Sequence, residues 1–370
     1  SSVYGETTMP DKLRRIGLAL GSGSAKGWSH IGVIRGLQEA NIAIDIVCGS
    51  SIGALVGGAF AAGKLDEAEK LIRELQWSDV LGFMEVPVPR SGIINSEKIS
   101  DYLRQRIGDP NIEDLPIPFA AVATDLTSGQ EVWLRQGSLI EAIRASISMP
   151  GMFTPCIREG RLLVDGGLVN PVPVSLCRSM GASTVIAVNP NTDVKIQYEM
   201  TKEPVLGGSP KPEPEAEEEE QGLRVRDLLF AGLTLYVTER IKRGKSAITG
   251  RSAEEENKGL RDHLMGYLSD YINATMKQGK SLALGQITED GTFREPSILE
   301  VILASINLMG DRIGRQRLAG DPPDVMILPH VSHVGPLEFN RADEVIEAGR
   351  RALNLMLPML RDQIGFVVTI

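Results

Sequence analysis

The chain has 370 residues, 42% of them hydrophobic, which is enough to fill one large α/β domain or two ordinary ones. Its formal charge is -9, and much of this lies in an acidic run at 211–220. The rest of the chain is evenly and mildly acidic, so it offers no basic face for nucleic acid. Three widely spaced cysteines offer no disulfide framework or zinc-ligand spacing, and no secretory pattern precedes Met9, so we expect a cytoplasmic protein without metal or cofactor.

Two strand–helix units are predicted first along the chain. Residues 14–20 alternate toward an apolar strand, a Gly-Ser-Gly-Ser run follows, and residues 27–40 show helical spacing. A second buried strand at 44–48 leads into a sharp turn at Ser51 and then into a helix of small residues at 52–62. Two such units in succession predict parallel neighbouring strands.

The same α/β pattern continues further along the chain. Apolar runs predict additional strands at 119–123, 131–134, 161–164, 184–189 and 324–328. Helical spacing predicts helices at 138–148, 297–318 and 341–357, the last of them stopped by Pro358. The expected fold is a three-layer α/β fold with a mostly parallel central sheet and helices on both faces.

The composition changes between residues 194 and 295. A Gly/Pro-rich stretch and an acidic run, together about 203–222, cannot pack and are expected to form a flexible linker. A helix at 228–237 is apolar almost all round and has a basic end, and a second helix with one apolar face follows it. We interpret this segment as an insertion into a domain made of 9–193 and 296–370. Its helices suit a lid, a peripheral membrane contact or a homodimer interface, and these alternatives stay open.

The segment Gly-Ser-Ser-Ile-Gly at 49–53 lies between the second strand and its helix. This is the context of a nucleophile elbow, in which a serine hydroxyl is exposed at the carboxyl edge of the sheet. The alternative is a packing turn with an incidental serine, because so short a motif often occurs by chance. The strand before Ser51 and the helix after it favour a nucleophile.

Acyl transfer also needs donors for the oxyanion of the tetrahedral intermediate. The loop before the first helix offers consecutive backbone N–H groups, those of Gly21, Ser22, Gly23, Ser24, Ala25 and Lys26. A P-loop or a dinucleotide fingerprint does not fit, because Lys26 is followed by Gly27 and Ser24 interrupts the glycine spacing. Further along, Asp165 leaves a strand into two glycines, a turn that can carry a carboxylate to the sheet edge.

These three motifs, in this order, resemble those of the bacterial patatin-like phospholipases, in particular the branch related to neuropathy target esterase. The resemblance covers about residues 14–192 and, less specifically, 297–350. It includes the motifs Thr124-Asp125-Leu126, Gly129, Ala142-Ile143-Arg144-Ala145-Ser146 and Met149-Pro150-Gly151. Ser22 and Ser24 stand where glycine is common in the family.

The resemblance implies a serine acyl hydrolase. Ser51 matches the nucleophile, Asp165 matches the aspartate of a Ser–Asp dyad, and the loop 21–26 matches the oxyanion hole, with no catalytic histidine and no cofactor. The implied substrates are fatty-acyl esters of phospholipids and lysophospholipids, cleaved through an acyl-enzyme. An aspartate that serves as the base near neutral pH is expected to be partly desolvated, with a raised pKa.

Alternatives to this function remain. His330 or His333 follows Ser51 and Asp165 in the chain order of a Ser-Asp-His triad, although either could simply cover the sheet edge. An acyl thioester passes through the same kind of oxyanion, so thioesterase activity is a second alternative. A lipid- or partner-binding regulator with an idle nucleophile is the third. We expect Cys48 to be core packing and Arg144 to be part of a structural salt bridge.

Overall fold

The computed structural model describes four stretches of the chain, residues 15–74, 92–191, 298–335 and 338–364. They fall into two compact units, and the second contributes only residues 298–304 to the described part. The first unit is described below. The predicted insertion at 194–295, with its linker at 203–222 and its helices, lies outside the described residues.

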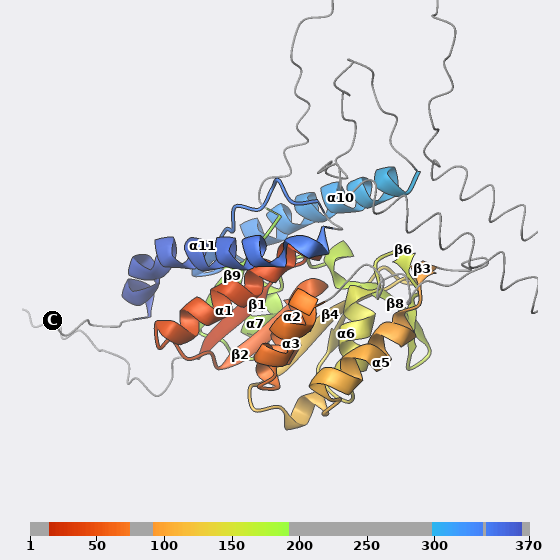
Figure 1. Cartoon of the computed structure of the whole chain (residues 1–370), viewed down its shortest axis with the longest axis horizontal. Helices are drawn as coiled ribbons and strands as arrows, with labels where there is room; N and C mark the ends of the chain where they lie inside the picture. Colours follow the sequence, from red (N-terminus) through yellow and green to blue (C-terminus); the bar gives the residue numbers. More distant parts are fainter. Residues whose placement is uncertain (1–14, 75–91, 192–297, 336–337, 365–370) are drawn as a thin grey trace, which may run out of the picture. The chain divides into compact units, whose positions relative to one another are not determined.

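A mixed β-sheet forms the centre of the first unit (Figure 1). Five neighbouring strands are parallel, in the order β10 (Val325–Ile327), β9 (Thr184–Val188), β1 (Ile16–Leu20), β2 (Ile46–Ser50) and β4 (Phe119–Asp125). Three further strands are antiparallel to their neighbours, namely β5 (Glu131–Leu134), β8 (Arg161–Asp165) and β7 (Cys156–Arg158). A separate two-stranded sheet joins β3 (Gly92–Ile94) to β6 (Gly151–Phe153).

Alternate side chains of the central strands enter two different hydrophobic cores. Leu18 and Leu20 of β1 lie in the larger core, whereas Ala19 between them lies in the smaller one. In β2, Val47 belongs to the larger core and Cys48 to the smaller. Because these side chains on both faces of β1 and β2 are apolar and fully buried, the centre of the sheet needs a cover on both sides.

Helices supply this cover. The larger core is closed by α1 (Ser29–Glu39), α2 (Ile52–Ala61), α3 (Leu65–Glu74), α5 (Ser96–Ile107), α6 (Leu139–Ile147) and α11 (Ala342–Gln363). The smaller core is closed by α7 (Val174–Ser179), and Leu318 of α10 (Ile298–Gly320) packs against it. Short 3₁₀ helices complete the list, η2 (Ser24–Trp28), η3 (Ile112–Asp114), η4 (Gly166–Leu168) and η5 (Phe339–Arg341). The predicted three-layer α/β fold is confirmed.

The strands β2 and β8 follow each other along one edge of β4. Val122 of β4 pairs with both β2 and β5, and Ala123 pairs with both β5 and β8. A strand has two edges, so β5 must occupy one of them and β2 and β8 must share the other. Ser50 pairs with Val122 and Asp165 with Ala123, so the ends of the two strands meet.

The end of the last helix differs from the prediction. Pro358 lies inside α11, which continues to Gln363, so the predicted stop at this proline is wrong. A proline inside a helix costs about 3 kcal/mol because it removes one hydrogen bond and crowds the preceding turn. The buried side chains of Leu360 and Ile364 offset this cost by holding the chain beyond it in the core. Among the described helices, none has the length and hydropathy that a membrane crossing requires.

Candidate active site

Ser51 occupies a strained turn between β2 and α2. Its backbone has φ 55° and ψ -125°, a region that residues with a side chain seldom adopt. The turn depends on the glycines on either side. A methyl group on Gly49 would lie 2.4 Å from the Cα of Ala54, and one on Gly53 would lie 2.2 Å from the carbonyl oxygen of Leu20. This strand–turn–helix geometry, with a glycine on each side, is the one that a nucleophile elbow requires.

The Ser51 hydroxyl donates a hydrogen bond of 2.5 Å to Oδ2 of Asp165. The other carboxylate oxygen, Oδ1, accepts a hydrogen bond of 2.7 Å from the backbone N–H of Gly167. On the backbone of Asp165, the carbonyl oxygen accepts a 2.7 Å hydrogen bond from the Thr124 hydroxyl. The carboxylate is therefore fixed in position and directed at the serine.

Both members of the pair are buried, with 5% of Ser51 and 3% of Asp165 exposed. The prediction of an exposed serine hydroxyl is therefore wrong for this arrangement, because the hydroxyl points at a carboxylate that is itself covered. Burial raises the pKa of Asp165 to about 6, while the hydrogen bonds from Ser51 and Gly167 act in the opposite direction. This confirms the expected desolvation of the carboxylate.

The loop before α1 lies beside both of these turns. A methyl group on Gly167 would lie 3.0 Å from Cβ of Ser22, and one on Gly27 would overlap the side chain of Ile52. Three of the six predicted oxyanion donors already have backbone acceptors: Gly21 donates to Val188, Ser22 to Pro171 and Lys26 to Gly23. Within the described part of the chain, the structure gives no hydrogen bond from the N–H groups of Gly23, Ser24 and Ala25.

His30 holds the start of this loop. Its Nε2 lies 2.7 Å from the carbonyl oxygen of Gly21, and its side chain is fully buried. Burial lowers the pKa of His30 to about 4, so the ring is neutral at physiological pH and its Nε2–H donates to this carbonyl. The histidine therefore fixes the loop and carries no charge there.

Among the contacts that the structure describes, neither of the two late histidines is hydrogen-bonded to the pair. Asp165 accepts its side-chain hydrogen bonds from Ser51 and Gly167, whereas Nε2 of the exposed His333 lies 2.5 Å from the carboxylate of Glu344. His330 is exposed. The described contacts thus favour a two-residue arrangement over a Ser-Asp-His triad.

The end of α6 contacts the backbone of both turns. Oγ of Ser146 accepts a hydrogen bond of 2.9 Å from the N–H of Ser51. Two residues later, the carbonyl oxygen of Ser148 accepts one of 3.0 Å from the N–H of Asp165. The sequence did not assign these contacts to either serine, although Ser146 lies in one of the motifs that carry the family resemblance.

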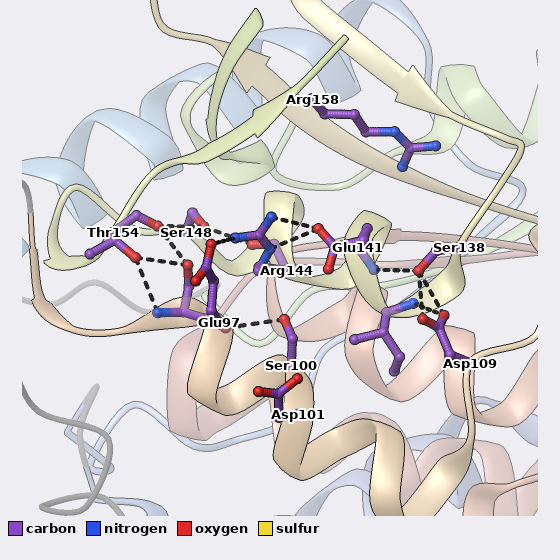
Figure 2. Close-up of polar contacts among 12 residues, drawn as sticks. Glu97, Ser100, Asp101, Asp109, Ser138, Glu141, Arg144, Ser148, Thr154 and Arg158 are labelled. Atoms are coloured by element: carbon purple, nitrogen blue, oxygen red, sulfur yellow. Dashed lines mark hydrogen bonds and ion pairs between the residues drawn. The ribbon is translucent and has the colours of Figure 1, made fainter. Parts of the chain in front are cut away.

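The remaining predicted features have structural roles. Arg144 forms ion pairs with Glu141 at 2.5 Å and with Glu97 at 3.6 Å, which confirms the expected salt bridge (Figure 2). Cys48 is a fully buried free thiol that packs in the smaller core, as expected. Burial and a neighbouring Cys177 keep the pKa of this thiol well above its usual value.

The fold and the pair define the class of the protein, an α/β domain with a hydrogen-bonded serine–aspartate pair at a strained strand-to-helix turn. Residues 18–178 match the patatin-like phospholipase family and form a domain of that kind. An uncharacterized NTE family protein of Mycobacterium bovis is 46% identical over 177 residues, which cover 48% of this chain and 49% of that protein. Human patatin-like phospholipase domain-containing protein 6 is 35% identical over 181 residues, which cover 47% of this chain and 13% of that protein. These findings confirm the predicted resemblance.

The similarity to known proteins covers a part of each chain. The match spans about half the length of the mycobacterial relative and a smaller share of the human one. Among solved structures, VipD from Legionella pneumophila aligns with a TM-score of 0.34 and 15% identity over 48% of this chain and 50% of its own.

Proposed function

We propose that this domain is a serine acyl hydrolase that cleaves fatty-acyl esters of phospholipids or lysophospholipids through a Ser51–Asp165 dyad and an acyl-enzyme. The observation that carries the proposal is the 2.5 Å hydrogen bond between Ser51 and Asp165 at a strained strand-to-helix turn. The match of residues 18–178 to the patatin-like phospholipase family supports lipid acyl hydrolase chemistry.

In the first half-reaction, Asp165 accepts the proton of Ser51 as the serine oxygen attacks the acyl carbonyl carbon. The carbonyl π-bond breaks and its electrons move to the oxygen, which becomes an oxyanion. When this intermediate collapses, the bond to the alcohol breaks, and Asp165 returns the proton to the leaving oxygen. The acyl group is then attached to Ser51, and Asp165 is again a carboxylate.

In the second half-reaction, a water molecule replaces the alcohol. Asp165 accepts one proton from the water, whose oxygen attacks the acyl-enzyme and forms a second oxyanion. Collapse of this intermediate releases the fatty acid, and the proton on Asp165 returns to the Ser51 oxygen. A carboxyl group with a pKa of about 6 suits both steps, because it is mainly ionised at neutral pH and still basic enough to take a proton.

The oxyanion is proposed to bind to the backbone N–H groups of Gly23, Ser24 and Ala25. In the described structure no hydrogen bond is given from these three groups, whereas those of Gly21, Ser22 and Lys26 donate to backbone carbonyls. Losing one such donor typically slows acyl transfer about 10²- to 10³-fold. His30 supports the site indirectly, since it holds the carbonyl of Gly21 at the start of the loop.

Fluorophosphonate labelling tests the proposal. The wild-type protein is expected to form a covalent adduct at Ser51, located by mass spectrometry of the peptides, and to release fatty acid from a lysophospholipid. Ser51→Ala is expected to lose both reactions and Asp165→Asn to slow both, with Cys48→Ala as a control for nonspecific labelling. Offering acyl-CoA of the same chain length separates an esterase from a thioesterase. Hydrolysis that persists in Ser51→Ala would contradict the proposal.

A further inference from the structure

One helix end contacts the backbone N–H groups of both members of the dyad. Ser146 lies in the last turn of α6 and Ser148 is the residue that caps it. The Ser146 hydroxyl accepts from Ser51, and the Ser148 carbonyl accepts from Asp165. The separation between nucleophile and base therefore depends on the position of Ser146 and Ser148, which lie two residues apart at the end of one helix.

The contact of Ser146 is the unusual one, because a side chain supplies the acceptor. β2 ends at Ser50, and Ser51 is the N-cap of α2, so the Ser51 N–H is outside the ladder of the strand and outside the hydrogen bonds of the helix. Ser146 is fully buried. Without its oxygen, the Ser51 N–H would be a buried donor without a partner, at a residue whose backbone is already strained.

The end of α6 is itself stabilised by polar contacts to neighbouring residues. The Ser148 hydroxyl donates a hydrogen bond of 2.7 Å to the carbonyl oxygen of Arg144 and lies 3.2 Å from the carbonyl oxygen of Thr154 (Figure 2). Thr154 is hydrogen-bonded to Ser96 at the start of α5: the Ser96 N–H donates a bond of 3.1 Å to Oγ1 of Thr154. The Arg144 side chain is paired with Glu141 on the same helix. These contacts make the last turn of α6 a fixed support.

We propose that Ser146 is a positioning residue for the nucleophile, which holds the strained Ser51 turn at the distance from Asp165 that proton transfer requires. The inference rests on the proposed function, since a positioning role has meaning only for a reaction at Ser51. Ser146 acts through the backbone of Ser51, and the dyad carboxylate keeps its own contacts to Gly167 and Thr124. Its loss should therefore slow the chemical step. Because the hydrogen bond from Ser51 lowers the pKa of Asp165, a longer distance between the two groups should also move the midpoint of the pH profile upward.

Two substitutions of Ser146 test whether its hydrogen-bond acceptor or the volume of its side chain is required. Ser146→Ala removes the oxygen, and Ser146→Cys fills the space with a somewhat larger sulfur, which is only a weak acceptor. The matched control is Ser100→Ala, which removes another buried serine hydroxyl. That hydroxyl donates a hydrogen bond of 3.1 Å to a carbonyl oxygen within its own helix. All variants are made in the full chain, and rates are expressed per folded molecule from circular dichroism.

The measurements are kcat and KM on the soluble ester p-nitrophenyl butyrate, the rate of fluorophosphonate labelling, and the pH profile. In both Ser146 variants, we expect kcat and the labelling rate to fall roughly ten- to a hundredfold, as misplacement of a reacting group by about 1 Å does. KM should stay at the wild-type value, whereas the midpoint of the pH profile should move upward as the hydrogen bond from Ser51 to Asp165 weakens. Ser100→Ala should keep the wild-type kcat even where its melting temperature falls.

Two results would overturn the inference while the proposed function stands. One is a wild-type kcat in both Ser146 variants, and the other is an equal loss per folded molecule in Ser100→Ala. A lower pH midpoint in Ser146→Cys would also count against it, since a weaker hydrogen bond from Ser51 can only raise the pKa of Asp165. A wild-type protein that neither hydrolyses esters nor labels at Ser51 would overturn the proposed function, and this inference with it.

Discussion

Ser51 and Asp165 are 114 residues apart in the chain and are joined by one hydrogen bond of 2.5 Å. They meet because β2 and β8 approach each other end to end along the same edge of β4. Ser50 pairs with Val122, and Asp165 pairs with the next residue, Ala123. The parallel direction of β2 and the antiparallel direction of β8 bring the carboxyl ends of both strands to one point of the sheet.

The first prediction concerns the pH dependence of turnover. Asp165 must be ionised to accept the proton of Ser51, and burial raises its pKa to about 6. We therefore expect kcat/KM to fall about tenfold per pH unit below this value and to be level above it. The measurement is kcat/KM on a soluble ester between pH 4.5 and 8.5. A profile that is flat down to pH 4.5 would exclude Asp165 as the base in this environment.

The second prediction concerns stability. The pKa of Asp165 is higher in the folded protein than its usual 3.8, so the folded state holds this proton more tightly than the unfolded state. Stability from this group is therefore present below about pH 4 and is lost as the pH rises through 6. Replacing Asp165 with Asn, which keeps an oxygen for Gly167, should raise the free energy of unfolding at pH 8 by up to about 3 kcal/mol.

Urea unfolding of the wild type and Asp165→Asn at pH 8 and pH 4 measures this difference. The gain of the variant should be largest at pH 8 and close to zero at pH 4, where the wild-type carboxyl group is protonated as well. Asp45→Asn serves as the control at the opposite end of the sheet, where the carboxylate accepts from the N–H of Ile16. An Asp165→Asn variant that is less stable than the wild type at pH 8 would show that the carboxylate is not desolvated.

The third prediction separates the dyad from a triad. His333 is exposed and paired with Glu344, so His333→Ala should keep kcat within about twofold of the wild type. His30 differs because its Nε2 holds the carbonyl of Gly21. His30→Gln, which retains an N–H donor, should keep more activity than His30→Ala. A loss of several orders of magnitude in His333→Ala would reinstate the triad.

The elements of the site could be predicted from local patterns, because each of them is local. An apolar strand, a small-residue turn and a helix surround Ser51 within about 20 residues, and Asp165 precedes two glycines at the end of a strand. The order of the motifs pointed to the family. Whether the serine and the aspartate meet depends on the register of β2 and β8 on β4, and no local pattern contains this information.

The loop 21–26, which is proposed as the oxyanion hole, shows the same limit. All six N–H groups from Gly21 to Lys26 were equivalent in the sequence, but Val188 and Pro171 accept two of them from distant parts of the chain. The role of Ser146 also depends on contacts made across 95 residues. Pro358 illustrates the opposite case, in which a strong local signal for a helix end is overruled because residues beyond it are buried in the core.

The last prediction tests the turn that carries Ser51. A methyl group on Gly49 would lie 2.4 Å from the backbone of Gly53 and Ala54, where no flexible side chain can move away. Gly49→Ala should therefore lower the free energy of unfolding by more than about 3 kcal/mol, or displace the turn and abolish labelling at Ser51.

Gly63 provides the control because it has a φ of 69° and open space around it. Gly63→Ala should cost only about 1–2 kcal/mol, the conformational penalty of a side chain in this region, and should leave labelling unchanged. The free energies come from urea unfolding and the labelling rates from fluorophosphonate adducts at Ser51. Gly49→Ala with the stability and labelling rate of Gly63→Ala would mean that α2 can move away from β2, and the strained turn would then have no rigid support.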